Sequence, residues 1–151
     1  MGKEALFGVL AEYFQDISYT CGAYVLRAIY SPVNQFGAEE KILAICHERL
    51  IEWNVLQRDT YIEISGRLEK NSYSRDAIYD VNDHSTIYSC RYNSKGIYIK
   101  SSKNVEEIDY MYNGSEYQRL YFFSEGKRKN QIVGISYDKI DLFDAKNRKL
   151  S

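Results

Sequence analysis

The chain has 151 residues, the usual size of one domain, and we expect a single compact domain over residues 1–151. Hydrophobic residues make up 44% of the chain and charged residues 27%, which excludes a mainly disordered chain, a collagen and a coiled-coil rod. The net charge of −1 supplies no positive surplus for non-specific binding to duplex DNA.

Two helical patterns are predicted in the N-terminal part of the chain. Apolar residues recur at helical spacing from about residue 3 to residue 30, which predicts one long helix, continuous or broken near Gly22. A second apolar stripe over about residues 38–56 predicts a second helix, with Trp53 near the middle of the stripe. The two helices are expected to form a hairpin over about residues 3–56, with Trp53 in the seam against a sheet.

An alternating pattern replaces the helical one from Thr60 onwards and predicts strands. The expected strands are 61–64, 78–81, 87–92, 97–99, 120–123, 132–135 and 140–143. Polar turns at 93–96 and 124–130 predict hairpins, and therefore an antiparallel meander of about five to seven strands over about residues 60–143, followed by a basic tail at 144–151. The expected fold is α+β, with the helical hairpin packed on a curved sheet, and the sequence leaves open whether that sheet encloses a pocket.

Motifs for catalysis, nucleotide binding and metal binding are not found in the sequence. No Gly-flanked nucleophile and no phosphate-binding glycine loop occurs, and His47 and His84 have no partners at ligand spacing. We therefore predict no catalytic residue, no cofactor and no metal. The three cysteines are odd in number and widely spaced, which predicts no disulfide bond and a reducing, cytoplasmic location without a secretion signal or membrane span.

Arg49 is predicted to lie near the centre of the apolar stripe of the second helix. A guanidinium in that place must pair with a carboxylate, a carbonyl or a ligand anion, or extend to the edge of the stripe. A structural salt bridge to Glu39 or Glu63 is the main interpretation of Arg49. The alternative is an anion or substrate contact at the mouth of a pocket between helix and sheet.

Tyrosines alternate with isoleucines in the predicted strands. Tyr61, Tyr79 and Tyr98 have the parity opposite to the neighbouring isoleucines, so they are expected to face outward if the isoleucines face the helices. An outward row of tyrosines is typical of protein-binding surfaces. Cross-strand pairing on a solvated sheet face explains the same pattern equally well.

An acidic aromatic segment over residues 105–117 contains no Lys or Arg. Its candidate partner-binding residues are Glu106, Glu107, Asp109, Tyr110, Tyr112, Glu116 and Tyr117. Such a segment complements a basic partner, although many acidic runs are simply solvated. Basic clusters at 127–129 and 146–149 permit binding to single-stranded RNA, but no RNA-binding motif accompanies them.

Together these features predict a non-enzymatic protein-binding module in the cytoplasm, with no membrane partner. A bacterial immunity protein that inhibits a cognate toxin fits this class, and its partner would be another protein, such as a basic toxin or nuclease. The rival hypothesis is a cone-shaped α+β enzyme or small-ligand binder whose internal pocket is lined by Tyr, Asp and Arg. An RNA-binding domain is the third hypothesis.

Overall fold

The computed structural model describes residues 25–31, 39–46, 50–56, 61–64, 74–83, 85–103, 110–147 and 149–150. Within these ranges the chain forms strands and no helix. The strands are β1 (Val25–Ser31), β2 (Lys41–Cys46), β3 (Leu50–Asn54), β4 (Tyr61–Glu63), β5 (Ser74–Tyr79), β6 (Thr86–Arg91), β7 (Ile97–Ser101), β8 (Tyr110–Tyr112), β9 (Tyr117–Phe122), β10 (Gln131–Ser136), β11 (Ile140–Asp144) and β12 (Lys149–Leu150). A search of this part of the chain finds no helix long and apolar enough to cross a membrane.

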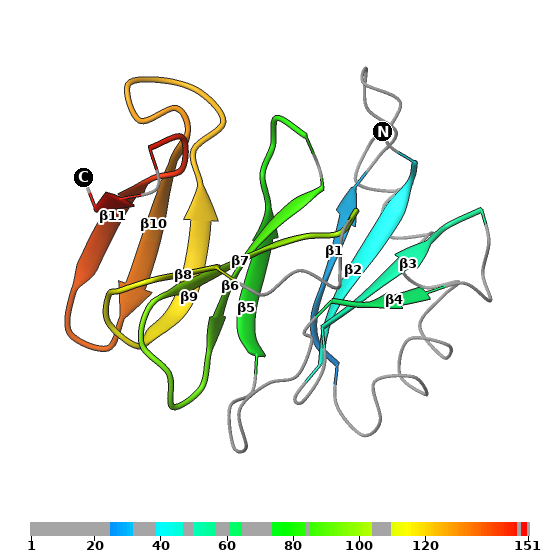
Figure 1. The fold of residues 1–151 in the computed structure, drawn as a ribbon, viewed down its shortest axis with the longest axis horizontal. Coiled ribbons are helices and arrows are strands. Elements are labelled where there is room, and N and C mark those ends of the chain that lie inside the picture. Colours follow the sequence, from blue (N-terminus) through cyan, green and yellow to red (C-terminus); the bar gives the residue numbers. More distant parts are fainter. Residues whose placement is uncertain are drawn as a thin grey trace.

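The strands form three antiparallel sheets, and each sheet consists of four strands that follow one another in the chain. The first sheet is β1–β4, the second is β5–β8 and the third is β9–β12. Figure 1 shows the sheets side by side in chain order, with the first and the third at opposite ends of the row. Strand β5 contacts β1 and β2 on one side and β9 on the other, so the second sheet is the middle of the fold.

The expected N-terminal helical hairpin is wrong, and so is the α+β class. Residues 25–31 form β1, and the predicted second helix contains the β2–β3 hairpin, in which Ile42 pairs with Trp53. Residues 1–24 lie outside the described part of the chain. Strand β2 is apolar along most of its length because both faces of the first sheet are buried, and such a run also fits a helical stripe.

Six of the seven strands expected after residue 60 are confirmed, as β4, β6, β7 and β9 to β11, whereas the expected strand 78–81 overlaps β5 only at Ile78 and Tyr79. They do not form one curved sheet, because the chain starts a new sheet at β5 and again at β9. The two predicted hairpin loops are also confirmed. Asn93 and Gly96 in the first loop, and Gly126 and Asn130 in the second, have positive φ angles, which Gly and Asn tolerate best.

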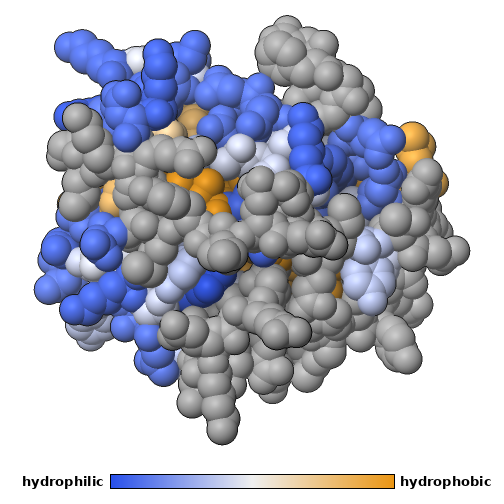
Figure 2. Space-filling model, viewed as in Figure 1, coloured by the Kyte–Doolittle hydropathy of each residue, from blue (hydrophilic) through white to orange (hydrophobic). Residues whose placement is uncertain are grey.

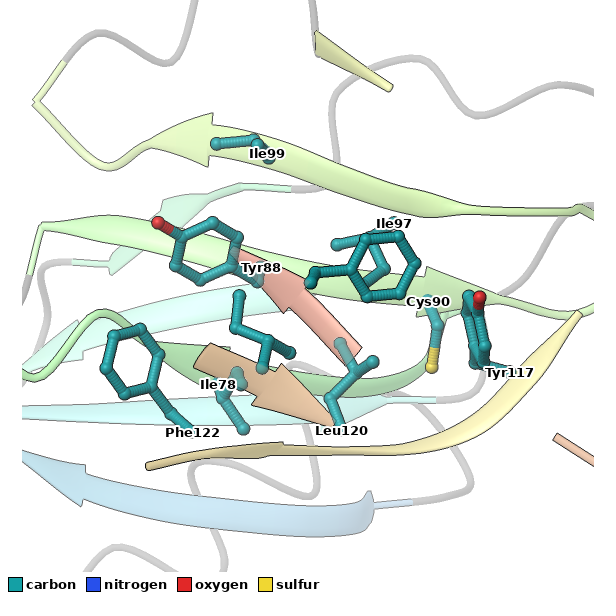
Figure 3. Packing of buried hydrophobic residues seen from close by; sticks show 10 residues of the cluster. Ile78, Tyr88, Cys90, Ile97, Ile99, Tyr117, Leu120 and Phe122 are labelled. Carbon is teal, nitrogen blue, oxygen red and sulfur yellow. The ribbon is translucent and has the colours of Figure 1, made fainter. Parts of the chain in front are cut away.

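Two apolar layers hold the three sheets together. The layer between the first and second sheets contains Leu43, Ile45, Leu50, Ile64, Ala77, Tyr79 and Ile87. The layer between the second and third sheets contains Ile78, Tyr88, Cys90, Ile97, Ile99, Tyr117, Leu120, Phe122, Ile132 and Phe143, and Figure 3 shows these side chains meeting between the two sheets. Strand β5 contributes Ile78 to one layer and Tyr79 to the other, so the second sheet is buried on both faces.

Trp53 lies in strand β3 and not in a seam between a helix and a sheet. It belongs to a third cluster with Ile42, Ala44, Cys46 and Ile51, on the face of the first sheet opposite the layer shared with the second. Its side chain is buried, and its ring centroid lies 5.2 Å from that of Tyr61 on the neighbouring strand. The predicted seam is therefore wrong, although the prediction that Trp53 is buried is confirmed.

The prediction that the chain has no disulfide bond is also wrong. Cys46 is disulfide-bonded, whereas Cys90 is a free and buried thiol. Cys21 lies outside the described residues. Disulfide bonds persist mainly in oxidising compartments, so the cysteines no longer support the expectation of a reducing, cytoplasmic location.

We expect the denatured, unreduced protein to contain one titratable thiol per chain, because one disulfide bond within the chain uses two of its three cysteines. Thiol titration in guanidinium chloride measures this number directly. Prior reduction should raise the count to three, and Cys90→Ala should lower the unreduced count to zero. Three thiols in the unreduced wild-type chain would contradict the disulfide bond at Cys46.

Candidate functional site

The third sheet has one face in the core and one face in solvent. The side chains that point into the core layer are Leu120, Phe122, Ile132 and Phe143, and Tyr117 joins them beyond the register shift between Ile135 and Ser136. The residues that alternate with them define the outer face, which consists of Arg119, Tyr121, Val133, Ile135, Ile140 and Leu142. The outer face is therefore mainly apolar, whereas the solvated face of an antiparallel sheet is usually polar.

The strand register arranges the outer face in two rows across the sheet. One row is Tyr121, Val133 and Leu142, and the next row is Arg119, Ile135 and Ile140. Paired strands lie about 4.8 Å apart, and successive residues on one face lie about 7 Å apart along a strand. Because both spacings are within the reach of side chains, the two rows form one continuous patch.

Several aromatic and aliphatic side chains of this region are open to solvent. Tyr121 is 58% exposed and Ile140 68% exposed, and Tyr137, in the turn between β10 and β11, is 92% exposed. The Tyr121 ring meets the Phe123 ring edge-on, with centroids 5.3 Å apart. A contiguous exposed apolar patch is a common sign of an interaction site, and aromatic rings are frequent anchors of such sites.

The basic loop between β9 and β10 lies at one end of the outer face. Lys127, Arg128 and Lys129 are exposed in this loop, and Arg119 is exposed on the outer face itself. The loop stands at the upper left of Figure 1, and Figure 2 shows hydrophilic side chains gathered over the same corner of the molecule. The apolar patch thus has cationic groups both within it and beside it.

A buried carboxylate connects all three sheets. Asp76 in β5 is fully buried, and its Oδ1 accepts a hydrogen bond from the Arg27 guanidinium of β1 at 2.7 Å. Its Oδ2 accepts a hydrogen bond from the backbone N–H of Leu120 in β9 at 2.9 Å. These hydrogen bonds stabilise the buried negative charge. We therefore interpret Asp76 as a structural residue that links the three sheets, and not as a catalytic acid.

A second buried carboxylate connects the first and second sheets. Glu52 in β3 is 5% exposed and accepts a hydrogen bond from the Tyr79 hydroxyl at 2.5 Å, and its other oxygen lies 3.5 Å from the Lys41 ammonium. Burial, with the negative charge of Glu52 beside it, raises the pKa of Tyr79 well above its usual value. Tyr79 therefore stays protonated and donates to Glu52 at all physiological pH values.

Tyr117 is fully buried between two glycines. A Cβ atom on Gly134 would lie 2.7 Å from its ring, and one on Gly114 would lie 2.5 Å from its hydroxyl oxygen. The hydroxyl donates to the Asp141 carboxylate at 2.5 Å, and the ring meets Phe143 edge-on at 5.5 Å. Burial and the hydrogen bond to Asp141 raise the pKa of Tyr117, which keeps the hydroxyl a donor.

Comparison with known proteins adds no family to this description. No protein-family model matches the chain, and no curated protein sequence matches it significantly. Among the residues that the structure describes, no group of three or more His, Cys, Asp or Glu side chains could hold a metal ion.

The three tyrosines predicted to face outward lie on different strands and do not form one row. Tyr61 is 44% exposed on β4 of the first sheet, as expected. Tyr98 on β7 is half-buried, with the Arg91 guanidinium 3.6 Å from its ring centroid. The expectation that Tyr79 faces outward is wrong, because it lies in the layer between the first and second sheets.

The acidic aromatic segment is only partly described. Glu106, Glu107, Asp109 and the side chains of Tyr110 and Tyr112 lie outside the described part, although β8 includes the backbone of both tyrosines. At the end of the segment, Glu116 accepts a hydrogen bond from the backbone N–H of Asn93 and lies 3.7 Å from the Arg75 guanidinium. Tyr117 is a core residue, so it is not placed to contact a partner.

Three further residues considered in the sequence also lie outside the described part of the chain. They are Arg49, His47 and His84.

The outer face was not identified as a candidate site from the sequence, although its strands were predicted. A signal for it exists in strands 120–123, 132–135 and 140–143, which carry apolar residues at both parities. A strand with apolar residues at both parities is typical of a sheet that is buried on both faces. Only the arrangement of the sheets reveals that the third sheet ends the row and leaves one of these faces open.

Proposed function

We propose that this protein is a non-enzymatic binding module that recognises another protein through the outer face of the third sheet. The observation that carries the proposal is the exposure of Tyr121, Ile135 and Ile140 on one face of a sheet whose other face is closely packed. Association with a partner would remove this apolar surface from water, which is the main favourable contribution to most protein–protein contacts.

The chemistry of the patch favours a protein over RNA. Exposed rings are present at Tyr121 on β9 and Tyr137 in the β10–β11 turn, but the four side chains that β10 and β11 contribute are aliphatic, so the rings do not form a continuous stacking platform for nucleic-acid bases; these four are Val133, Ile135, Ile140 and Leu142. Single-stranded RNA binding needs such platforms together with a cationic groove. An inhibitor of another protein, for example an immunity protein, is one class of module that would use an exposed apolar face of this kind.

The test compares Ile140→Glu with Leu56→Glu. Ile140 lies on the outer face, whereas Leu56 is an exposed apolar residue that follows β3 in the first sheet, so the two variants introduce the same charge at sites of similar exposure. Wild-type protein and both variants are used to capture proteins from the source cells. The purified partner is then titrated by calorimetry.

We expect Leu56→Glu to bind the partner like wild type and Ile140→Glu to bind it at least about tenfold more weakly, because a buried unpaired carboxylate costs more than about 1.4 kcal/mol. Circular dichroism and denaturation curves must show that both variants are folded. Equal capture and equal affinity for all three proteins would contradict a binding site on the outer face.

A further inference from the structure

We propose that the partner bound by the outer face presents acidic side chains around an apolar contact. This inference rests on the proposed function, because it specifies the chemistry of the same surface. It starts from the charge of residues 117–147, which contain six basic and four acidic residues and carry a net charge of +2, whereas the whole chain carries −1. The part of the chain that bears the outer face is thus its cationic part.

The basic groups near the outer face are available to a partner. Lys127, Lys129 and Arg119 are exposed and form no ion pair with the acidic residues of the described chain. Arg128 is exposed and reaches only the Gln131 side chain, at 3.4 Å. Cations that keep their hydrogen-bonding capacity at the rim of an apolar patch can pair with carboxylates of a partner.

Three of the four acidic groups of residues 117–147 accept hydrogen bonds within the chain, and Asp138 is one of them, because it accepts from the Ser136 hydroxyl. Asp141 accepts the Tyr117 hydroxyl and lies 3.9 Å from the Lys139 ammonium. Asp144 accepts hydrogen bonds from the backbone N–H groups of Lys146 and Asn147, which shapes the turn after β11. The fourth acidic residue, Glu125, is exposed in the β9–β10 loop beside three cations, so the groups that project freely at this surface are mainly cations.

The positive charge beside the outer face also distinguishes between possible binding partners. A second copy of the chain would bring its own cationic loop against this one, and like charges that face each other at an interface are unfavourable. Nucleic acid satisfies the cations but leaves the aliphatic centre without a matching surface. A protein with an apolar contact and an acidic rim complements both features at once.

Two fluorescent octapeptides serve as probes, one with alternating leucine and glutamate and one with alternating leucine and lysine. An oligouridylate is the nucleic-acid probe. Binding is measured by fluorescence anisotropy at low and high salt for wild type, Ile140→Glu, and the triple variant Lys127→Glu, Arg128→Glu, Lys129→Glu. Lys95→Glu, at an exposed lysine in the loop between β6 and β7, is the control for a single charge reversal in the second sheet, outside the patch.

We expect wild type to bind the acidic peptide at least about tenfold more tightly than the basic one, with a preference that decreases as salt screens the charges. The triple variant should lose the preference, Lys95→Glu should keep it, and Ile140→Glu should weaken binding of both peptides. Sedimentation at the same concentrations should show a monomer.

The remaining outcomes separate this inference from the proposed function. Equal binding of both peptides, lost in Ile140→Glu, would overturn the acidic partner and leave the binding face intact. Binding of neither peptide, or of oligouridylate alone, would overturn both. A dimer that Ile140→Glu dissociates would show that a second copy of the chain occupies the face.

Discussion

Asp76→Ala is expected to lower the free energy of unfolding by about 3 kcal/mol. The substitution removes the acceptor of the buried Leu120 N–H, and an unsatisfied buried donor costs about 1 to 3 kcal/mol. It also removes the acceptor of the Ala77 N–H and the ionic partner of Arg27. The Arg27 side chain is 41% exposed and can turn to solvent, so the loss of the ion pair adds less than it would in a closed core.

Guanidinium denaturation followed by tryptophan fluorescence measures this loss. Asp76→Asn keeps the shape of the side chain and one acceptor oxygen. It should therefore lower the free energy of unfolding by less than Asp76→Ala does. Glu125→Ala is the control, because Glu125 is exposed in the β9–β10 loop, and its effect should stay within about 0.5 kcal/mol. If Asp76→Ala lowers the free energy of unfolding by less than about 1 kcal/mol, the contacts of Asp76 do not hold the three sheets together.

Gly134→Ala is expected to destabilise the fold by about 2 kcal/mol, although alanine in a strand is usually better than glycine. The usual preference is about 0.5 to 1 kcal/mol in favour of alanine. At this position the new Cβ would lie 2.7 Å from the ring of Tyr117, which is packed on all sides and cannot move away. Overpacking of a closed core costs about 1 to 3 kcal/mol.

A double-mutant cycle checks the cause of this effect. In the background of Tyr117→Ala the ring is gone, so Gly134→Ala should then cost less than about 0.5 kcal/mol or should stabilise the protein. The coupling between the two positions should therefore exceed about 1.5 kcal/mol. Equal costs of Gly134→Ala in both backgrounds would mean that the ring of Tyr117 is not the obstacle.

The β2–β3 hairpin, which was predicted to be a helix, shows that the spacing of apolar residues cannot always distinguish a helix from strands. Ile42, Ile45 and Trp53 fit a helical stripe, but Ile42 and Trp53 also face each other across two paired strands. A strand buried on both faces leaves no alternation to recognise, and its apolar run matches a helix equally well. The same limit hid the outer face, since apolar residues at both parities of a strand do not reveal which side another sheet will cover.

The sequence by itself determined six of the strands after residue 60 and the two hairpin loops, because alternation and residues that tolerate positive φ are local properties. The tertiary structure alone decided that Tyr79 and Tyr117 are buried, that Cys46 is disulfide-bonded, and that Tyr121 and Ile140 are exposed. These outcomes depend on which sheet lies against which face. Contacts between strands far apart in the chain set that arrangement, and no spacing within one strand encodes it.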